Sequence, residues 1–281
     1  MIAARQVLRR LPAYAVLIAC AALLLFPLFV TFAYSLHPVV DFVENPPPSL
    51  WPDDPQWGNY FGGGASSGAI EGNFPRYLLN SFVMAGVITL GQLVTSSMAA
   101  YAFTFLRFPG RDYLFLVFLA TMMVPLEVAI IPNFQTIQWL GWTDTYQGLV
   151  APFLATGFGT FLLRQYFRTI PTELRDAAEM DGYGHFRFLW RVVVPLSGGA
   201  LATLAVFAFI QAWNQYLWPL LVTNDPDMRT VQIGIASETA QIDKISVAFA
   251  GTIISFLPML LLVVAFQRYL VRGLLGGAVK G

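Results

Sequence analysis

Six long apolar segments dominate this sequence and set what the chain can fold into. A helix that crosses a bilayer needs about 20 apolar residues, because the hydrocarbon core is roughly 30 Å thick and each residue rises about 1.5 Å. We expect one spanning helix from each segment, namely Leu11–Ser35, Leu78–Leu106, Tyr113–Pro132, Gly148–Phe167, Leu196–Val222 and Val247–Val271. The sequence therefore predicts an all-α membrane protein, with residues 1–281 as a single transmembrane domain.

Composition and charge agree with this class. Hydrophobic residues make up 57% of the chain and charged residues only 11%, where a soluble domain carries about a quarter. The formal net charge is zero, so no overall basic field points to nucleic acid. Cys20 is the one cysteine, so no disulfide can form within the chain.

The placement of arginine and lysine orients the segments. With a cytoplasmic N-terminus, only Arg76, Arg229 and Lys244 of the 16 basic residues fall in outside segments, which leaves 13 inside. Basic residues gather on the cytoplasmic side of membrane proteins, so both termini are expected inside. The first apolar run is too long for a secretory signal and has no clear small-residue cleavage site, so we expect it to be retained.

Two loops stand out for their length. The outside loop, residues 37–77, is rich in proline, glycine, aromatic and acidic residues. It is either a solvated connector or a cap that docks an external partner, and composition alone favours the connector.

The cytoplasmic loop, residues 165–195, has the pattern of a helix, a glycine and a second helix. Thr172 can cap the first helix, and Glu173 and Asp176 suit its positive N-terminal end. Gly182 is placed to stop that helix, and a second one is expected from about His185. This segment is too polar for lipid and too regular for a tether, which favours a docking element.

The same loop resembles the EAA segment of the membrane subunits of bacterial ABC importers. The family pattern is Glu-Ala-Ala, two variable residues, Asp-Gly, and a proline thirteen residues after the glycine. Here residues 176–182 read DAAEMDG, and Pro195 lies thirteen residues after Gly182. Asp176 replaces the usual glutamate and Val194 the usual leucine, and neither departure changes charge or apolarity.

Further motifs are similar to the carbohydrate-importer branch, in particular the second permease of maltose and glycerol-3-phosphate importers. The similarity covers the chain from about Leu78 to its end. The motifs are Asn80-Ser81, Ala100-Tyr101-Ala102-Phe103, Phe108-Pro109-Gly110-Arg111, Met123-Val124-Pro125-Leu126-Glu127, Trp213-Asn214 and Gly276-Gly277-Ala278-Val279-Lys280-Gly281.

This resemblance implies a type I ABC importer fold in a bacterial cytoplasmic membrane, and a non-catalytic permease for a sugar or glycerol-phosphate-type solute. It implies a second homologous permease, two ATP-binding cassette ATPases and an external solute-binding protein as partners. No cofactor or metal is expected on this chain, because ATP and Mg²⁺ belong to the ATPase. The implied ATPase-coupling residues are Glu173, Asp176, Ala177, Ala178, Asp181 and Gly182.

Polar residues inside the fifth segment are candidates for the solute pathway, since polar groups in a span face a cavity or a partner helix. Gln211, Asn214, Gln215 and Trp218 follow at i, i+3, i+4 and i+7, which is one face of a helix. Amides beside an aromatic ring suit a neutral polyol. The alternative is that they only hold helices together by hydrogen bonds.

Three more residues join this candidate set. Gln92 and Thr95 in the second segment can line the pathway or simply pack between helices. Glu127 is the one acid well inside a predicted span, near Pro125, where a break is expected. It either lines a gate or contacts the external binding protein, or it is a structural acid near the interface.

An ion-driven secondary transporter is the main alternative function. That class normally buries charged residues in its spans, whereas these spans are almost free of charge. No Gly-x-x-x-x-Gly-Lys-Ser/Thr phosphate loop occurs, so ATP hydrolysis is expected on a separate chain.

Overall fold

The computed structural model describes residues 2–44, 46–62 and 68–275, and over these ranges the chain is helical with no strand. The chain folds as two compact units, each assembled from two stretches of sequence. Unit 1 combines Met1–Pro75 with Gly234–Leu257, and unit 2 combines Arg76–Ile233 with Pro258–Gly281. Each unit is described by itself.

Unit 1 holds the first helix and the described part of the loop that was predicted to lie outside. Its elements are α1 (Ile2–Ser35), α2 (Val39–Glu44), α3 (Gly58–Phe61), most of α14 (Val231–Thr239), η4 (Ile242–Lys244) and the first part of α15 (Ile245–Leu275). The rings of Tyr34 and Phe42 pack on Phe249 of α15, with centroids 5.6 and 5.8 Å away. Aromatic packing of this kind joins segments far apart in the sequence.

The described segment after α2, around α3, packs against the end of α1. The side-chain amide of Asn59 donates to the carbonyl oxygens of Ser35 and His37 at 3.0 and 3.1 Å. The hydroxyls of Tyr60 and Ser35 are 2.6 Å apart. Burial raises the pKa of the Tyr60 phenol, an effect larger than the lowering by the Ser35 hydrogen bond.

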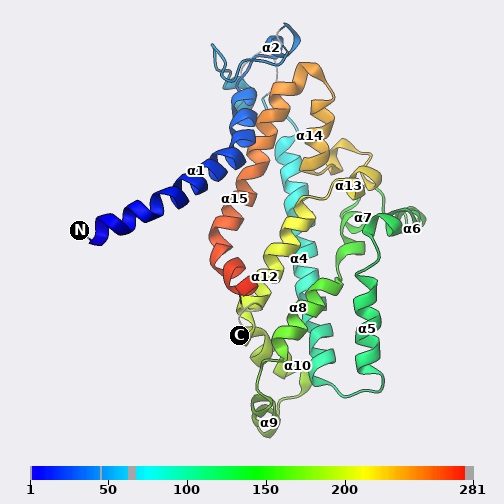
Figure 1. Ribbon diagram of the computed structural model, residues 1–281. Helices are drawn as coiled ribbons and strands as arrows, with labels where there is room; N and C mark the ends of the chain where they lie inside the picture. Colours follow the sequence, from blue (N-terminus) through cyan, green and yellow to red (C-terminus); the bar gives the residue numbers. More distant parts are fainter. Residues whose placement is uncertain (1, 45, 63–67, 276–281) are drawn as a thin grey trace. The chain divides into compact units, whose positions relative to one another are not determined.

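Unit 2 contains the remaining helices, and α8 packs against both α5 and α12 (Figure 1). Its elements are α4 (Phe74–Phe105), α5 (Arg111–Thr121), α6 (Leu126–Trp139), α7 (Tyr146–Val150), η1 (Ala151–Phe153), α8 (Gly157–Phe167), α9 (Thr172–Met180), α10 (His185–Phe188), the π-helical η2 (Leu189–Val193), α11 (Val194–Leu196), α12 (Gly198–Trp213), α13 (Leu217–Val222) and η3 (Pro226–Met228).

Three described helices are long and apolar enough to cross a membrane: Pro12–Ser35, Phe74–Phe105 and Ile242–Gln267. They correspond to the first, second and sixth predicted spans. Two bent helix pairs raise the number of candidate spans to five. The pair Tyr146–Phe153 and Gly157–Phe167 bends by 47°, and the pair His185–Leu196 and Gly198–Trp213 by 83°.

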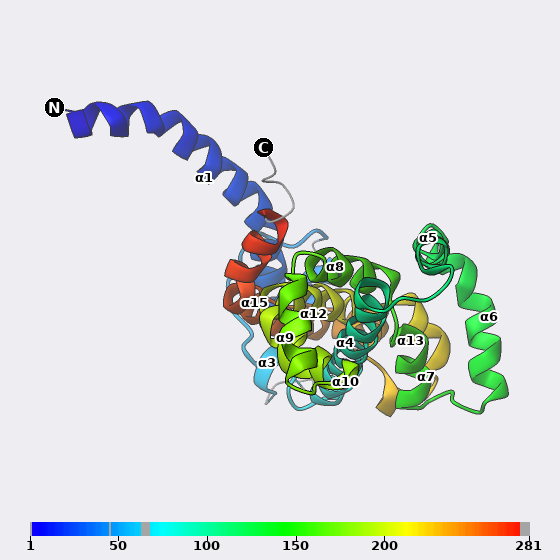
Figure 2. The ribbon, with the colours of Figure 1, turned by 90° about the horizontal axis from the view of Figure 1, so that it is seen from below.

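The third predicted span, Tyr113–Pro132, is not a continuous helix. Helix α5 ends at Thr121, and α6 begins at Leu126 in a different direction (Figure 2). The break comes before Pro125, because a proline disfavours helical backbone at the residue that precedes it. With 11 residues, α5 is roughly 16 Å long, which is shorter than a usual crossing.

The fifth predicted span, Leu196–Val222, is also interrupted. Helix α12 ends at Trp213, and α13 resumes at Leu217. Pro219 explains the gap, because its ring has no N–H and would collide with the carbonyl oxygen of Gln215 in a continuous helix.

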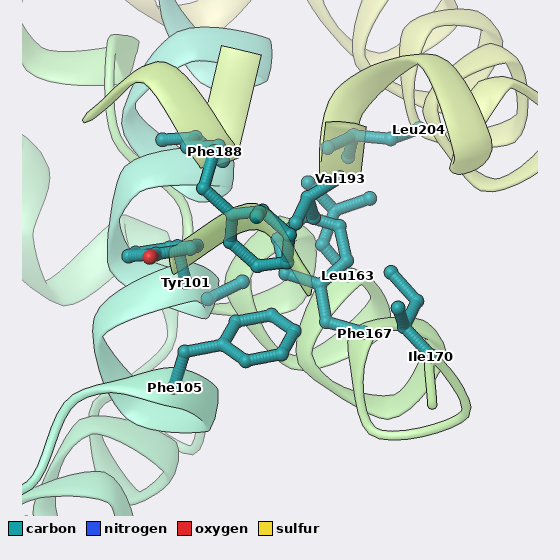
Figure 3. Packing of buried hydrophobic residues seen from close by; sticks show 11 residues of the cluster. Tyr101, Phe105, Leu163, Phe167, Ile170, Phe188, Val193 and Leu204 are labelled. Atoms are coloured by element: carbon teal, nitrogen blue, oxygen red, sulfur yellow. The ribbon is translucent and has the colours of Figure 1, made fainter. Parts of the chain in front are cut away.

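The core of unit 2 beside α9 and α10 is a cluster of buried apolar side chains (Figure 3). Tyr101 and Phe105 come from α4, Phe167 from α8 and Phe188 from α10. The ring of Phe105 meets that of Phe188 edge-on, with centroids 5.6 Å apart. This cluster anchors the loop that was predicted to be a docking element.

Candidate functional site

Helix α9 is the first half of the predicted docking element and lies at one end of unit 2 (Figure 1). The helix begins with Thr172 in its first turn, after Pro171, and no side chain caps it. The prediction that Thr172 caps the helix is therefore wrong, because Pro171 takes the position before the helix and puts the threonine inside it. Glu173 lies in the first turn, where its negative charge interacts favourably with the partial positive charge of the helix N-terminus.

The end of α9 is built around Gly182, as the sequence predicts. Its φ of +77° lies in the left-handed region that favours glycine. The N–H of Gly182 donates to the carbonyl of Glu179 at 3.0 Å, and that of Tyr183 to the carbonyl of Ala178 at 2.8 Å. These two bonds form a Schellman motif, which stops α9 and turns the chain into α10.

The candidate coupling residues divide into an outer and an inner group. Ala178 is buried in the core cluster, where its small side chain lets α9 lie close to the other helices. The other five are exposed, namely Glu173, Asp176, Ala177, Asp181 and Gly182. Met180 lies beside them and is 85% exposed, which is unusual for a large apolar side chain next to a polar surface.

A groove of about 810 Å³ separates this helix from the turn after α4. Its lining includes Arg107 and Phe108 of the turn and Arg175, Asp176 and Glu179 of α9. Two exposed acids of the docking element, Asp176 and Glu179, thus border an open, polar depression that is large enough for side chains of another protein.

The pathway candidates Glu127, Gln215 and Trp218 meet at a second, smaller pocket of about 210 Å³. It lies between α6, η1 and the gap before α13, and it also contains Asn133 and Tyr216. The Oε1 atom of Gln215 is buried and has no hydrogen-bond partner among the described residues. A buried acceptor of this kind is costly unless a ligand, a partner or water satisfies it.

Gln211 and Asn214 lie elsewhere. The four polar residues of the fifth segment were expected on one helical face, and this prediction is wrong because α12 ends at Trp213. Gln211 is exposed on the last turn of α12 and Asn214 is exposed directly after it, whereas Trp218 is buried beyond the gap.

Gln92 and Thr95 brace the bend before α8. The amide of Gln92 donates to the carbonyl of Phe153 at 2.9 Å, and the hydroxyl of Thr95 donates to that of Leu154 at 2.8 Å. Both carbonyls belong to the break between η1 and α8, which leaves backbone groups without helical partners. These contacts agree with the packing alternative for both residues.

Comparison with known proteins connects this geometry to a family. Residues 92–276 match the model of the binding-protein-dependent transport system inner membrane component. The chain belongs to this family. It is a multi-pass component of a cytoplasmic membrane and acts as a permease rather than an enzyme.

The similarity of this inner membrane component to individual relatives extends over almost its whole length. It is 40% identical over 266 residues to the sn-glycerol-3-phosphate transport system permease protein UgpE of Brucella abortus (strain 2308), covering 92% of this chain and 93% of the relative. A chain of a bacterial ABC transporter that imports the acidic polysaccharide alginate is similar at a TM-score of 0.76, with 22% identity and coverage of 93% and 96%. The alginate transporter in complex with its alginate pentasaccharide-bound periplasmic protein gives a TM-score of 0.64, with 14% identity and coverage of 95% and 97%.

Sequence reasoning missed several residues of this inner membrane component that hold the docking element in place. Arg175 donates to the carbonyl of Phe105, the last residue of α4, at 2.9 Å. The hydroxyl of Tyr101 and Nδ1 of His185 are 3.0 Å apart. The sequence holds one signal for these contacts: Arg175 and Glu179 have the i, i+4 spacing of an ion pair on one helix.

The opposite end of α4 is held in a similar way. The side-chain amide of Asn80 donates to the carbonyls of Asp227 and Arg229 at 2.8 and 2.9 Å. Its Oδ1 accepts from the hydroxyl of Tyr146 at 2.6 Å. Asn80 thus joins three segments that are distant in the sequence.

Proposed function

We propose that this chain is the transmembrane subunit of an ATP-driven importer and takes a sugar or a glycerol-phosphate-type solute into the cell. The family and the 40% identity to a glycerol-3-phosphate permease support this solute class. The docking element on α9 supports a separate ATPase as the source of energy. ATP and Mg²⁺ would be bound by that ATPase.

The proposal includes six crossings in one transmembrane domain, with both termini in the cytoplasm. Five candidate spans come from the long helices and bent pairs. Helix α5 would be the sixth, since Leu114, Leu116 and Val117 are exposed apolar residues suited to lipid. A short crossing is tolerated when the bilayer thins around it.

Coupling would occur where the exposed acids of α9 meet basic groups on the ATPase. The observation that carries this assignment is the 85% exposure of Met180 at the tip of a helix whose Ala178 is buried. Such a side chain is expected to enter an apolar pocket of a partner, with Asp181 next to it in the chain. The Schellman turn at Gly182 holds the tip in one shape.

The experiment is purification of the tagged chain from gently solubilised membranes, with and without Asp181→Lys. The unaltered chain should carry an ATPase, a second homologous permease and the external solute-binding protein. Asp181→Lys should lose the ATPase and keep the permease. Asp53→Lys, an exposed acid in the loop predicted to lie outside, is the matched control and should keep the ATPase and the second permease.

The opposite result would refute the proposal. A chain that purifies alone, or only with copies of itself, would favour the ion-driven secondary transporter. Retention of the ATPase by Asp181→Lys would remove α9 from the docking surface.

The solute pathway would include the pocket at Glu127, Gln215 and Trp218, continued by Gln211 and Asn214 toward a partner permease. The unpartnered acceptor of Gln215 and the carboxylate of Glu127 would accept hydrogen bonds from solute hydroxyls. No lysine or arginine lies among the described residues that line this pocket. A phosphate group would therefore need positive charge from another chain.

A further inference from the structure

We propose that Arg175, together with the Tyr101–His185 pair, fastens the docking element to α4 so that movement of α9 is passed to α4 directly. These would be positioning residues, acting between the ATPase site and the solute pocket. The inference rests on the proposed docking role of α9. It adds which helix receives the movement and through which side chains.

Arg175 makes the first contact. Its Nη1 donates to the carbonyl oxygen of Phe105 at 2.9 Å, and its Nε donates to Glu179 at 2.8 Å. The final carbonyls of a helix have no partner within it and carry partial negative charge, so an arginine is well suited to bind there. Glu179 holds the guanidinium from the other side and fixes its direction.

The second contact lies one turn earlier on α4. The hydroxyl of Tyr101 is 3.0 Å from Nδ1 of His185, the first residue of α10. The ring of Phe188 packs against those of both Tyr101 and Phe105, with centroids 6.3 and 5.6 Å away (Figure 3). The docking element is therefore held to α4 on both sides of Gly182, by Arg175 before it and by His185 after it.

The covalent route that follows the docking element, from α10 to α12, is much less regular than α4. It passes through the π-helical segment Leu189–Val193 and then bends by 83° at Ser197. In contrast, α4 is one helix of 32 residues, roughly 48 Å long at 1.5 Å per residue. A continuous helix moves as a rigid element, whereas a π-segment and a bend absorb displacement.

Helix α4 also reaches the solute pocket. Gln92 binds the carbonyl of Phe153, and the side chain of Phe153 lines the pocket beside Gln215 and Trp218. The contacts from α9 through Arg175, α4 and Gln92 to Phe153 thus form one unbroken series. Such a series can carry energetic coupling, and a measured coupling is what establishes that it does.

The test is solute transported per ATP hydrolysed by the complete importer in liposomes, with its binding protein present. The variants are Arg175→Met, Tyr101→Phe and the double variant. Tyr101→Phe removes one oxygen atom and leaves the ring packing, so a lower transport ratio in this variant would not result from misfolding. We expect normal ATPase content, ATP hydrolysis within two-fold of the unaltered importer, and at least a five-fold lower transport ratio in the double variant.

Two comparisons make this result specific. Arg175→Lys keeps a charged donor but lacks the planar fork that binds two acceptors, so it should restore part of the ratio. Arg111→Met removes an arginine that donates to the carbonyl of Leu106 from α5 rather than from the docking element, and it should leave the ratio unchanged.

An unchanged ratio in the double variant would overturn the proposal. Loss of the ATPase from Arg175→Met would also overturn it, since Arg175 would then belong to the docking surface itself. Failure of the docking role would be seen separately, as ATPase retained by Asp181→Lys.

Discussion

The indole N–H of Trp218 donates to the carbonyl oxygen of Gly148 at 3.1 Å, within the buried part of unit 2. Trp218 lies on α13 and Gly148 on α7, so this bond joins two interrupted spans. The ring of Trp218 also meets Phe153 edge-on, with centroids 5.7 Å apart. One side chain therefore supports the pocket wall and satisfies a backbone group beside it.

Replacing Trp218 by phenylalanine should destabilise the protein. The change keeps an aromatic ring but leaves the carbonyl of Gly148 without this donor, which costs about 1–3 kcal/mol for a buried group. Thermal unfolding of the purified chain in detergent measures the effect. Trp139→Phe, at a side chain that is 83% exposed, is the matched control, and an equal effect of both changes would contradict the assigned role.

Gly182→Ala should weaken the docking element without removing it. A non-glycine residue with left-handed backbone costs roughly 1–2 kcal/mol. Limited proteolysis between α9 and α10 should become faster in the variant. Gly184→Ala is the control, because Gly184 has a φ of −76° and open space around it; equal proteolysis of the two variants would argue against the strained position.

Gly159→Val should disturb the packing of α8. A Cβ atom at Gly159 would lie 2.5 Å from Oγ of Ser96 and 3.0 Å from Cδ1 of Leu204, so these side chains would have to shift. Overpacking of this kind typically costs about 1–3 kcal/mol. Gly86→Ala, where nothing lies within 4 Å, should instead leave the unfolding temperature equal or higher. The same shift in both variants would contradict the close approach seen at Gly159.

Gln215→Leu should impair uptake more than stability. Loss of a hydrogen bond to a solute hydroxyl costs about 0.5–1.5 kcal/mol, which is roughly a two- to ten-fold weaker uptake at low solute concentration. Initial uptake rates of sn-glycerol-3-phosphate and of maltose, each at several concentrations, measure this effect. Gln135→Leu on the exposed side of α6 is the control. Normal uptake by Gln215→Leu for whichever solute is transported would remove Gln215 from the pathway.

Several features of this chain could be predicted because they depend on residues close together in sequence. The helices around Leu78–Leu106 and Val247–Val271 follow from apolar length alone, and α4 and α15 confirm them. The turn at Gly182 follows from the freedom of glycine in left-handed backbone.

The interrupted spans could be predicted only in part. Apolar length makes Tyr113–Pro132 and Leu196–Val222 look like ordinary crossings, whereas prolines break both. Whether a proline kinks, ends or merely bends a membrane helix depends on which neighbours satisfy the freed backbone groups. For the break after Phe153 these neighbours are Gln92 and Thr95, more than fifty residues away in sequence.

The sequence by itself determined the class of protein, the family, and the local shape of the docking element, since hydropathy and the spacing from Asp176 to Pro195 are local properties. Only the tertiary structure decided which side chains meet. Arg175 reaches the end of α4 across seventy positions, and Glu127 meets Gln215 at a pocket between two interrupted helices. Contacts of this kind depend on how helices pack, and packing is set by side chains that are distant in sequence.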